Sequence, residues 1–119
     1  MNESSPDRAA VLAVAEQEAR ASGLRVLGRQ WRSGEHELEL VAAAGERVLV
    51  VIEVTVAEHG AVVPDFADVS EKRIAELESA ARAWMAGHDV RYRQIRVDVA
   101  GLSPDGRGGF TAEYIEGAA

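Results

Sequence analysis

Cysteine is absent from this sequence of 119 residues, so disulfide bonds, thiolate metal sites and cysteine nucleophiles are all excluded. Lysine is almost absent as well, because Lys72 is the single lysine among thirteen basic residues and the other twelve are arginine. No apolar run approaches the roughly 20 residues of a membrane helix. The first residues also lack the basic start and apolar run of a secretory signal. We therefore expect a cytoplasmic protein.

Positive charge is in short supply, because twenty acidic residues face thirteen basic ones and the net charge is -7. An acidic chain is a poor candidate for a general nucleic-acid binder, since contacts to phosphate supply most non-specific affinity. A local arginine patch is still compatible with this balance, because arginine binds phosphate through two parallel hydrogen bonds. The length predicts one domain over residues 1–119 with a sizeable core.

Residues 34–56 have the pattern of a β-hairpin that carries acids. Residues 35–41 alternate between polar and apolar positions, which is typical of a half-buried strand. Residues 48–56 are almost continuously apolar and β-branched, which predicts a strand covered on both faces. Glu53 interrupts this second strand, and a buried carboxylate costs several kcal/mol unless it is paired or coordinated. Glu53 should therefore have a cationic partner, either a metal ion or an arginine.

The turn of the hairpin decides whether Glu53 has an acidic neighbour. A three-residue loop, Ala44-Gly45-Glu46, would place Glu37 opposite Glu53 with their Cβ atoms about 5 Å apart. Two carboxylates this close need a proton or a cation between them, and Mg²⁺ prefers such oxygen ligands. An even-length loop would put them on opposite faces. Alternatively, Glu35, Glu37 and Glu39 are the solvated face of an edge strand.

The remaining sequence predicts two helices and three further strands. A helix over residues 5–22 would be capped by Ser5, and a second over residues 68–86 would be capped by Asp68. The second helix has an apolar stripe that should face the sheet: Ile74, Leu77, Ala81 and Trp84. The other strands are expected at residues 24–32, 93–102 and 110–115.

The predicted element order is α-β-β-β-α-β-β, and its last strand-helix-strand step indicates a mixed central sheet flanked by helices. Within strand 24–32, Arg25, Arg29 and Trp31 should share a face. Such a strand could follow a phosphate backbone and stack a base. The alternative is that the arginine stems cover a tryptophan anchored in the core.

Three stretches of the chain, in this order and spacing, resemble one known family. Gly34-Glu35-His36-Glu37-Leu38 resembles that family's Gly-Glu-Ile-Asp-Leu, and Val50-Val51-Ile52-Glu53-Val54-Thr55 resembles its Val-Phe-Val-Glu-Val-Lys. Arg96-Val97-Asp98-Val99 resembles its Arg-Phe-Asp-Val strand. The family is the YraN family, and the resemblance implies the restriction-endonuclease-like PD-(D/E)XK fold, an α/β architecture.

The resemblance also implies a nuclease site that departs from its usual form. Glu37 and Glu53 would be the catalytic acids that hold Mg²⁺ or Mn²⁺, with Glu37 replacing an aspartate. Thr55 stands where the family has its catalytic lysine, and Lys72 at the start of the second helix is a candidate to compensate. Losing one charge-stabilising group typically lowers the rate by about 10²- to 10³-fold. The implied activity is a metal-dependent endonuclease that is weakened or lost.

Two functions remain open from the sequence. In the first, the protein binds DNA or RNA, including branched forms, through Arg25, Arg29, Arg32 and Lys72. In the second, it is a non-catalytic module that keeps only the fold and recruits a protein partner through its acidic surface. The net charge and Thr55 favour the second function. The order and spacing of the stretches that resemble the family favour the first function as the ancestral one. The family's first helix also carries a Gly-Glu pair, which falls on Val11 and Leu12 here.

Overall fold

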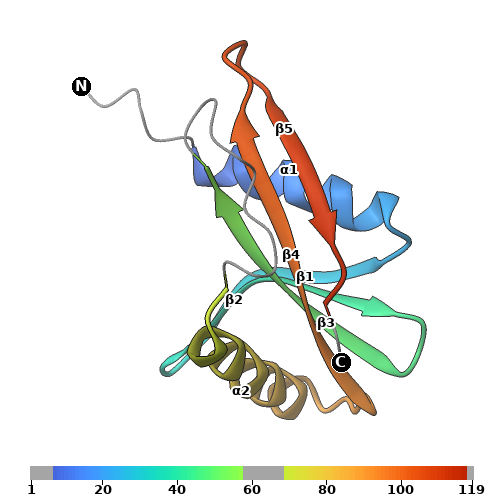
Figure 1. Ribbon diagram of the computed structural model, residues 1–119. Coiled ribbons are helices and arrows are strands. Elements are labelled where there is room, and N and C mark those ends of the chain that lie inside the picture. Colours follow the sequence, from blue (N-terminus) through green and yellow to red (C-terminus); the bar gives the residue numbers. More distant parts are fainter. Residues whose placement is uncertain (1–6, 58–68, 118–119) are drawn as a thin grey trace.

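A five-stranded mixed sheet separates two helices in the computed structural model, which describes residues 7–57 and 69–117 (Figure 1). The elements in chain order are α1 (Arg8–Ala21), β1 (Arg25–Ser33), β2 (His36–Ala44), β3 (Val48–Val56), α2 (Glu71–His88), β4 (Gln94–Pro104) and β5 (Phe110–Ile115). The strands lie in the sheet in the order of the sequence, and all neighbours are antiparallel except β3 and β4. The predicted order α-β-β-β-α-β-β and the restriction-endonuclease-like α/β fold are confirmed.

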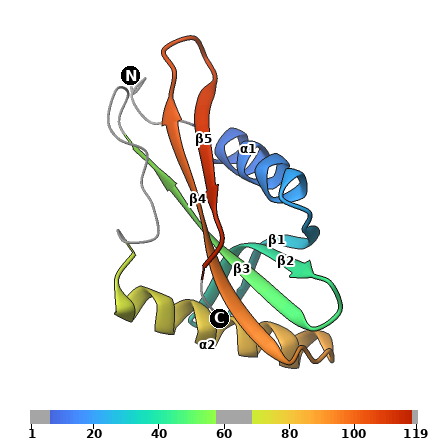
Figure 2. The same cartoon turned by 45° about the vertical axis from the view of Figure 1, so that its right-hand side comes forward.

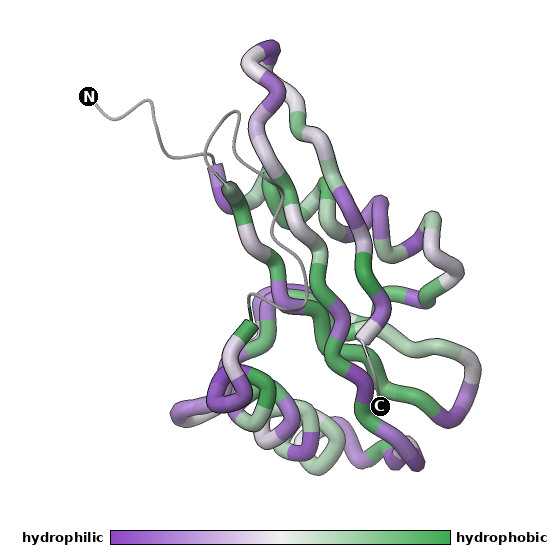
Figure 3. The backbone as a smooth tube through the Cα atoms, in the orientation of Figure 1, coloured by the Kyte–Doolittle hydropathy of each residue, from purple (hydrophilic) through white to green (hydrophobic). Residues whose placement is uncertain are grey.

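The two helices cover opposite faces of the sheet (Figure 2). Along β3, Val50 and Ile52 belong to the apolar cluster that contains α1, while Leu49 and Val51 belong to the cluster that contains α2. This alternation confirms that β3 is covered on both faces, as its continuous apolar sequence predicts. Figure 3 shows the same distribution, with apolar residues concentrated along the central strands and polar residues on the outer side of α2.

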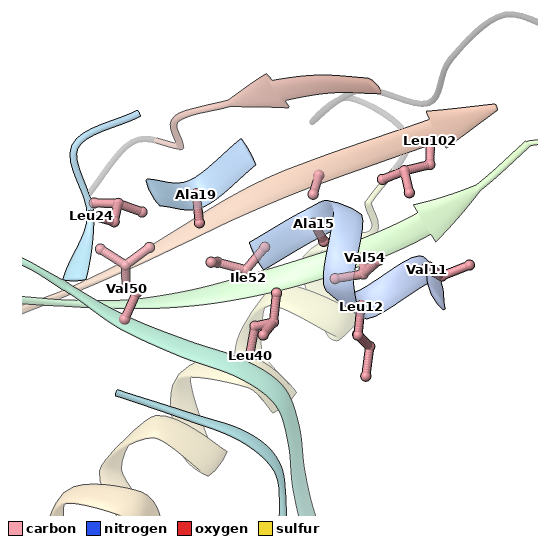
Figure 4. Packing of buried hydrophobic residues seen from close by; sticks show 12 residues of the cluster. Val11, Leu12, Ala15, Ala19, Leu24, Leu40, Val50, Ile52, Val54 and Leu102 are labelled. Carbon is pink, nitrogen blue, oxygen red and sulfur yellow. The ribbon is translucent and has the colours of Figure 1, made fainter. Parts of the chain in front are cut away.

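Leu12 lies in the core between α1 and the sheet. Its side chain is 0% exposed and packs in one cluster with Ala15, Leu40 and Ile52 (Figure 4). Val11 is buried as well, at 1% exposure. The two positions where the related family has Gly-Glu are thus core positions in this chain. Neither of them contributes a polar group to a cleft.

Helix α1 begins two residues later than the predicted cap suggests. Asp7 is the N-cap, and its carboxylate accepts a hydrogen bond from the amide of Ala9 at 3.2 Å. Aspartate is one of the strongest capping residues because it satisfies an amide that the helix itself leaves unpaired. The predicted cap, Ser5, lies outside the described residues.

Helix α2 begins and ends at other residues than predicted. Ser70 is the N-cap and accepts a hydrogen bond from the amide of Arg73 at 3.1 Å, while the predicted cap Asp68 lies outside the described residues. The helix continues through Gly87 and ends at His88, and its C-cap Asp89 has a left-handed φ of 53°. A left-handed residue after the last turn is a common way to end a helix. Strand β4 extends two residues beyond its predicted end at residue 102.

The edge strand β1 is irregular, which changes the direction of its side chains. A bulge lies between Val26 and Gly28, and Gln30 has a φ of 54°. As a result, Trp31 packs in the cluster on the α2 side, whereas Arg29 is paired with a glutamate of α1. The prediction that Arg29 and Trp31 share a face is therefore wrong. The bulge precedes both residues, so the change of face between them lies at Gln30, whose left-handed backbone interrupts the regular alternation of the strand.

Candidate functional site

The carboxylate of Glu53 is held by an arginine from α2. Arg73 Nε donates to Glu53 Oε2 at 2.9 Å, and Arg73 Nη2 donates to Glu53 Oε1 at 3.1 Å. Glu53 lies on the face of β3 that α2 covers, and its side chain is 16% exposed. In this bidentate pair, Arg73 is the cationic partner that a largely buried carboxylate needs. Arg73 also contacts Glu76 at 3.5 Å, one turn further along α2.

A second arginine reaches the same place from α1. Arg8 Nε donates to Glu39 Oε2 at 2.6 Å, and its Nη2 contacts the other oxygen of Glu39. The same Nη2 donates to the backbone carbonyl of Val54 at 3.1 Å. Arg8 therefore joins β2 to β3 next to Glu53, since Val54 directly follows it in the strand.

The observed register of the hairpin explains why Glu39 occupies this position. Ala44 pairs with Val48, and the ladder between β2 and β3 continues to Leu40 and Ile52. One further step along both strands would bring Glu39 opposite Glu53. The predicted pairing of Glu37 with Glu53 is therefore wrong by two residues along β2.

The cause of this error lies in the turn, whose three residues are Gly45, Glu46 and Arg47 instead of Ala44, Gly45 and Glu46. The carbonyl of Arg47 accepts hydrogen bonds from the amides of Arg93 at 2.9 Å and Gln94 at 3.1 Å. Arg47 is thus fixed by the start of β4 and does not pair with β2. Such a long-range contact cannot be read from the hairpin sequence.

Glu53 influences both arginines electrostatically, together with Glu39 at Arg8 and with Glu76 at Arg73. The pKa of Arg8 is raised, first by the hydrogen bond to Glu39 and then by the charges of Glu39 and Glu53, while burial acts in the opposite direction. The pKa of Arg73 is raised chiefly by its hydrogen bond to Glu53. A shared influence of Glu53 on both guanidinium groups indicates that the four side chains form one charged cluster. We call Arg8, Glu39, Glu53 and Arg73 the arginine-acid cluster.

Beside this cluster, a groove of about 710 Å³ lies between the start of β2 and the first turns of α2. Glu35, His36 and Glu37 line one side, and Lys72, Arg73 and Glu76 are among the residues of the other. Glu37 also borders a second hollow that contains Trp31 and Arg32. Arg32 Nε donates to Glu37 Oε2 at 3.0 Å, so the predicted acid Glu37 is occupied by an arginine.

Thr55 lies two residues after Glu53 and therefore on the same face of β3. Its hydroxyl oxygen is buried and has no hydrogen-bond partner among the residues that the structure describes. A hydroxyl carries no charge, so Thr55 cannot neutralise Glu53 or a developing negative charge as the family's lysine would. Arg73 is the residue that supplies a positive charge at this position.

The described residues do not fit a divalent metal site. Within residues 7–57 and 69–117 there is no group of three or more His, Asp or Glu side chains that could hold a metal ion. Both oxygens of Glu53 already accept hydrogen bonds from Arg73, and Glu37 is paired with Arg32. Ca²⁺ or Mg²⁺ would need several free oxygen ligands here. The predicted Mg²⁺ or Mn²⁺ ligation by Glu37 and Glu53 stays a prediction, and no reaction step is derived from it.

The four predicted nucleic-acid-binding residues are all exposed, but they are not equally free. Arg29 is paired with Glu16 and Arg32 with Glu37, while Arg25 lies at the opposite end of β1 from Arg32. Only Arg32 and Lys72 border the adjoining hollows that share Glu37. The structure thus brings two of the four residues together near the start of α2.

Sequence reasoning missed three members of the arginine-acid cluster: Arg8, Glu39 and Arg73. The need of Glu53 for a cation was a usable signal, and an arginine was one of its two expected partners. The sequence contains twelve arginines. It does not specify which of them would lie next to Glu53 in the folded protein. Residues 58–67, which include His59 and whose glycine and proline favour a loop, lie outside the described residues.

A five-stranded mixed sheet between two helices defines this chain as an α/β protein of the restriction-endonuclease-like architecture, and the comparison with known proteins identifies its family. Residues 13–102 match the model of the uncharacterised protein family UPF0102, the YraN family that the sequence resembles. The chain belongs to this family. Arg8 precedes the matched region, while Glu39, Glu53 and Arg73 lie within it.

Several relatives are similar over most of the chain, and each is described as a UPF0102 protein. The one from Arthrobacter sp. (strain FB24) is 34% identical over 97 residues, which cover 82% of this chain and 81% of the relative. The one from Beutenbergia cavernae is 35% identical with the same coverage. The one from Nitratidesulfovibrio vulgaris is 36% identical over 82% of this chain and 71% of the relative. No helix in the described part of the chain has the length and apolar character to span a membrane.

Proposed function

We propose that this protein is a cytoplasmic nucleic-acid-binding member of its family, with cleavage activity that is weakened or lost. The observation that carries the proposal is that Arg32 from β1 and Lys72 from α2 border two hollows that share Glu37. These exposed cations come from elements far apart in the sequence; Lys72 lines the groove beside the acids, and Arg32 lines the second hollow.

The existing ion pairs do not prevent this binding. Arg32 and Glu37 are both largely exposed, and such surface pairs contribute only about 0–1 kcal/mol. A phosphate group can therefore compete with Glu37 for the guanidinium of Arg32. Lys72 is exposed at the start of α2, where the helix amides and the dipole also favour negative charge. The acids nearby will limit the affinity, because they repel phosphate.

The weakened chemistry follows from Thr55 and Arg73. Thr55 supplies no charge to stabilise the transition state of phosphodiester cleavage, which typically costs about 10²- to 10³-fold in rate. Arg73 occupies both oxygens of Glu53, so this carboxylate is not available as a base or a ligand. Binding without efficient cleavage is what these residues support.

The proposal is tested by fluorescence anisotropy with duplex and branched DNA at about 50 and 200 mM salt. If about three phosphates are neutralised, the affinity should fall roughly 40-fold between these salt concentrations. The variant Arg32→Ala/Lys72→Ala should bind at least tenfold more weakly. Arg107→Ala is the matched control, because Arg107 is exposed in the turn between β4 and β5, far from α2 (Figure 1). Absence of salt-dependent binding in the wild type would refute the proposal.

A second candidate function is a protein-interaction module, and the charge of the groove favours it. Three acids line the groove, Glu35, Glu37 and Glu76, against two cations, Lys72 and Arg73. A basic protein segment would suit this surface better than phosphate. If the protein binds no DNA or RNA at low salt, this second function becomes the better account of the groove.

A further inference from the structure

We propose that Arg8 and Arg73 take the place of a divalent cation between β2 and β3, so that this site is independent of metal ions. The inference deepens the proposed function, since it concerns the same site and rests on that function for the role of the site. Its test measures ion binding and not nucleic-acid binding, so the two proposals can fail separately.

The guanidinium groups of the two arginines occupy the carboxylate oxygens that a metal cation would use. Arg73 bonds both oxygens of Glu53, and Arg8 bonds both oxygens of Glu39. A single nitrogen of Arg8, Nη2, contacts a Glu39 oxygen and also donates to the Val54 carbonyl at 3.1 Å. One nitrogen that bridges two oxygens from neighbouring strands makes contacts like those of a bound cation. The pairing is bidentate on both carboxylates, which fixes the geometry.

The positive and negative charges of the arginine-acid cluster balance. Arginine is always protonated in proteins, so Arg8 and Arg73 together carry the double positive charge of one divalent ion. Glu39 and Glu53 carry two negative charges, and their side chains are only 25% and 16% exposed. Acids that are this well covered need compensation close by. The arginine-acid cluster supplies it internally, and an added Mg²⁺ would leave the cluster with excess positive charge.

The arginine-acid cluster also accounts for the threonine at position 55. A lysine at position 55 would lie on the same face as Glu53 and would add a third cation beside two acids. A threonine avoids this repulsion at the cost of a buried hydroxyl that has no partner among the described residues. A threonine at position 55 is thus compatible with Arg73 as the cation that neutralises Glu53.

The experiment compares the response to millimolar Mn²⁺ and Mg²⁺ in thermal denaturation and, for Mn²⁺, in electron paramagnetic resonance of the bound ion. Wild type should show no shift in Tm and no bound Mn²⁺ signal. Arg8→Gln/Arg73→Gln removes both positive charges, and Mn²⁺ should then raise Tm by roughly 5 °C at an ion concentration about ten times its dissociation constant. Adding Glu39→Gln/Glu53→Gln to this variant should abolish the gain.

Two further variants keep the test decisive if the double variant folds poorly. Arg73→Gln alone should acquire a smaller Mn²⁺ response, while Arg73→Lys, which keeps the charge, should not. Arg82→Gln is the matched control, because Arg82 is an exposed arginine of the same helix outside the cluster. A Mn²⁺-dependent rise in wild type that Glu53→Gln abolishes would overturn the inference. Folded Arg73→Gln and Arg8→Gln/Arg73→Gln proteins without any Mn²⁺ response would overturn it as well.

Discussion

The hydroxyl of Tyr114 in β5 donates a hydrogen bond of 2.5 Å to the carboxylate of Asp98 in β4, a carboxylate that is 0% exposed. Arg96 binds the same carboxylate through Nε at 2.8 Å and Nη2 at 3.0 Å, and the amide of Gly117 donates to it at 2.9 Å. Asp98 is thereby fully compensated inside the protein. The stretch that resembles the family's Arg-Phe-Asp-Val strand therefore acts as a structural tie between β4 and the end of the chain.

Removing this hydroxyl should destabilise the fold. Tyr114→Phe deletes a hydrogen bond to a charged acceptor and should lower the free energy of unfolding by about 1.5–3 kcal/mol. Urea denaturation monitored by circular dichroism measures the change. Tyr92→Phe is the control, because Tyr92 lies outside the Asp98 network and should change stability by less than about 0.5 kcal/mol. Equal effects of the two variants would show that the Tyr114 hydrogen bond contributes little.

The apolar stripe of α2 gives a second prediction about stability. Trp84 is 6% exposed and packs with Leu77 and Ala81 against the sheet, as the helical spacing predicted. Trp84→Ala should cost about 3–5 kcal/mol, because it leaves a cavity in the core. Denaturant unfolding provides the measurement, with Val90→Ala as the control since Val90 is 38% exposed. A loss below about 1 kcal/mol for Trp84→Ala would mean that the core can collapse around the missing side chain.

Lowering the pH should weaken the ion pair between Glu16 of α1 and Arg29 of β1. The pKa of Glu16 is lowered in the folded protein, mainly by its hydrogen bond to Arg20 and also by Arg29. A lowered folded pKa stabilises the protein above the unfolded value of about 4.5, and this contribution is lost as the pH falls through the folded pKa. Glu16→Gln should therefore be less stable than wild type near pH 7, and the difference should disappear as the pH falls well below 4.5. A difference that is the same at pH 3 and pH 7 would contradict this prediction.

Local patterns predicted the elements well, because helices and strands depend on periodic burial. The alternation in β2 reflects a strand with one covered face, and the continuous apolar run of β3 reflects a strand covered on both faces. The Trp84 stripe reflects the face of α2 that packs on the sheet. The relations across strands were predicted less well. The register depended on how Arg47 contacts the start of β4, and the faces of β1 depended on a bulge and on the left-handed backbone of Gln30, neither of which has a clear sequence signal.

The candidate site shows the same limit. The sequence correctly singled out Glu53 as a residue that needs a cation, because the cost of a covered carboxylate is a local property. It could not choose the partner, since Arg73 and Arg8 come from two different helices on opposite faces of the sheet. Leu12 shows the converse case, because a family position that carries an acid elsewhere is here part of the core.

The final prediction concerns the lysine that Thr55 replaces. In Thr55→Lys, the new ammonium would compete with Arg73 for the carboxylate of Glu53, and the acid would stay neutralised by an arginine. We therefore expect Thr55→Lys alone to cleave no faster than wild type. Thr55→Lys/Arg73→Gln frees Glu53 and restores the Glu-x-Lys pairing on one strand face, so Mn²⁺-dependent nicking of flapped or branched DNA should rise at least tenfold above wild type. Residues that act as a unit have non-additive effects, which is why both changes are needed together.

Two controls separate restored chemistry from other causes of nicking. Adding Glu53→Gln to the active double variant should abolish the nicking, because the reaction depends on that carboxylate. Thr55→Val/Arg73→Gln removes the hydroxyl without adding charge and should stay silent, which tests the need for the ammonium. Leu12→Glu is unsuitable for restoring a further acid, since it would place a charge in the core next to Ile52. Nicking by wild type that Glu53→Gln abolishes would show that Arg73 does not block this acid. Silence of a folded Thr55→Lys/Arg73→Gln protein would mean that the site lacks more than its lysine, and would favour the interaction module over a latent nuclease.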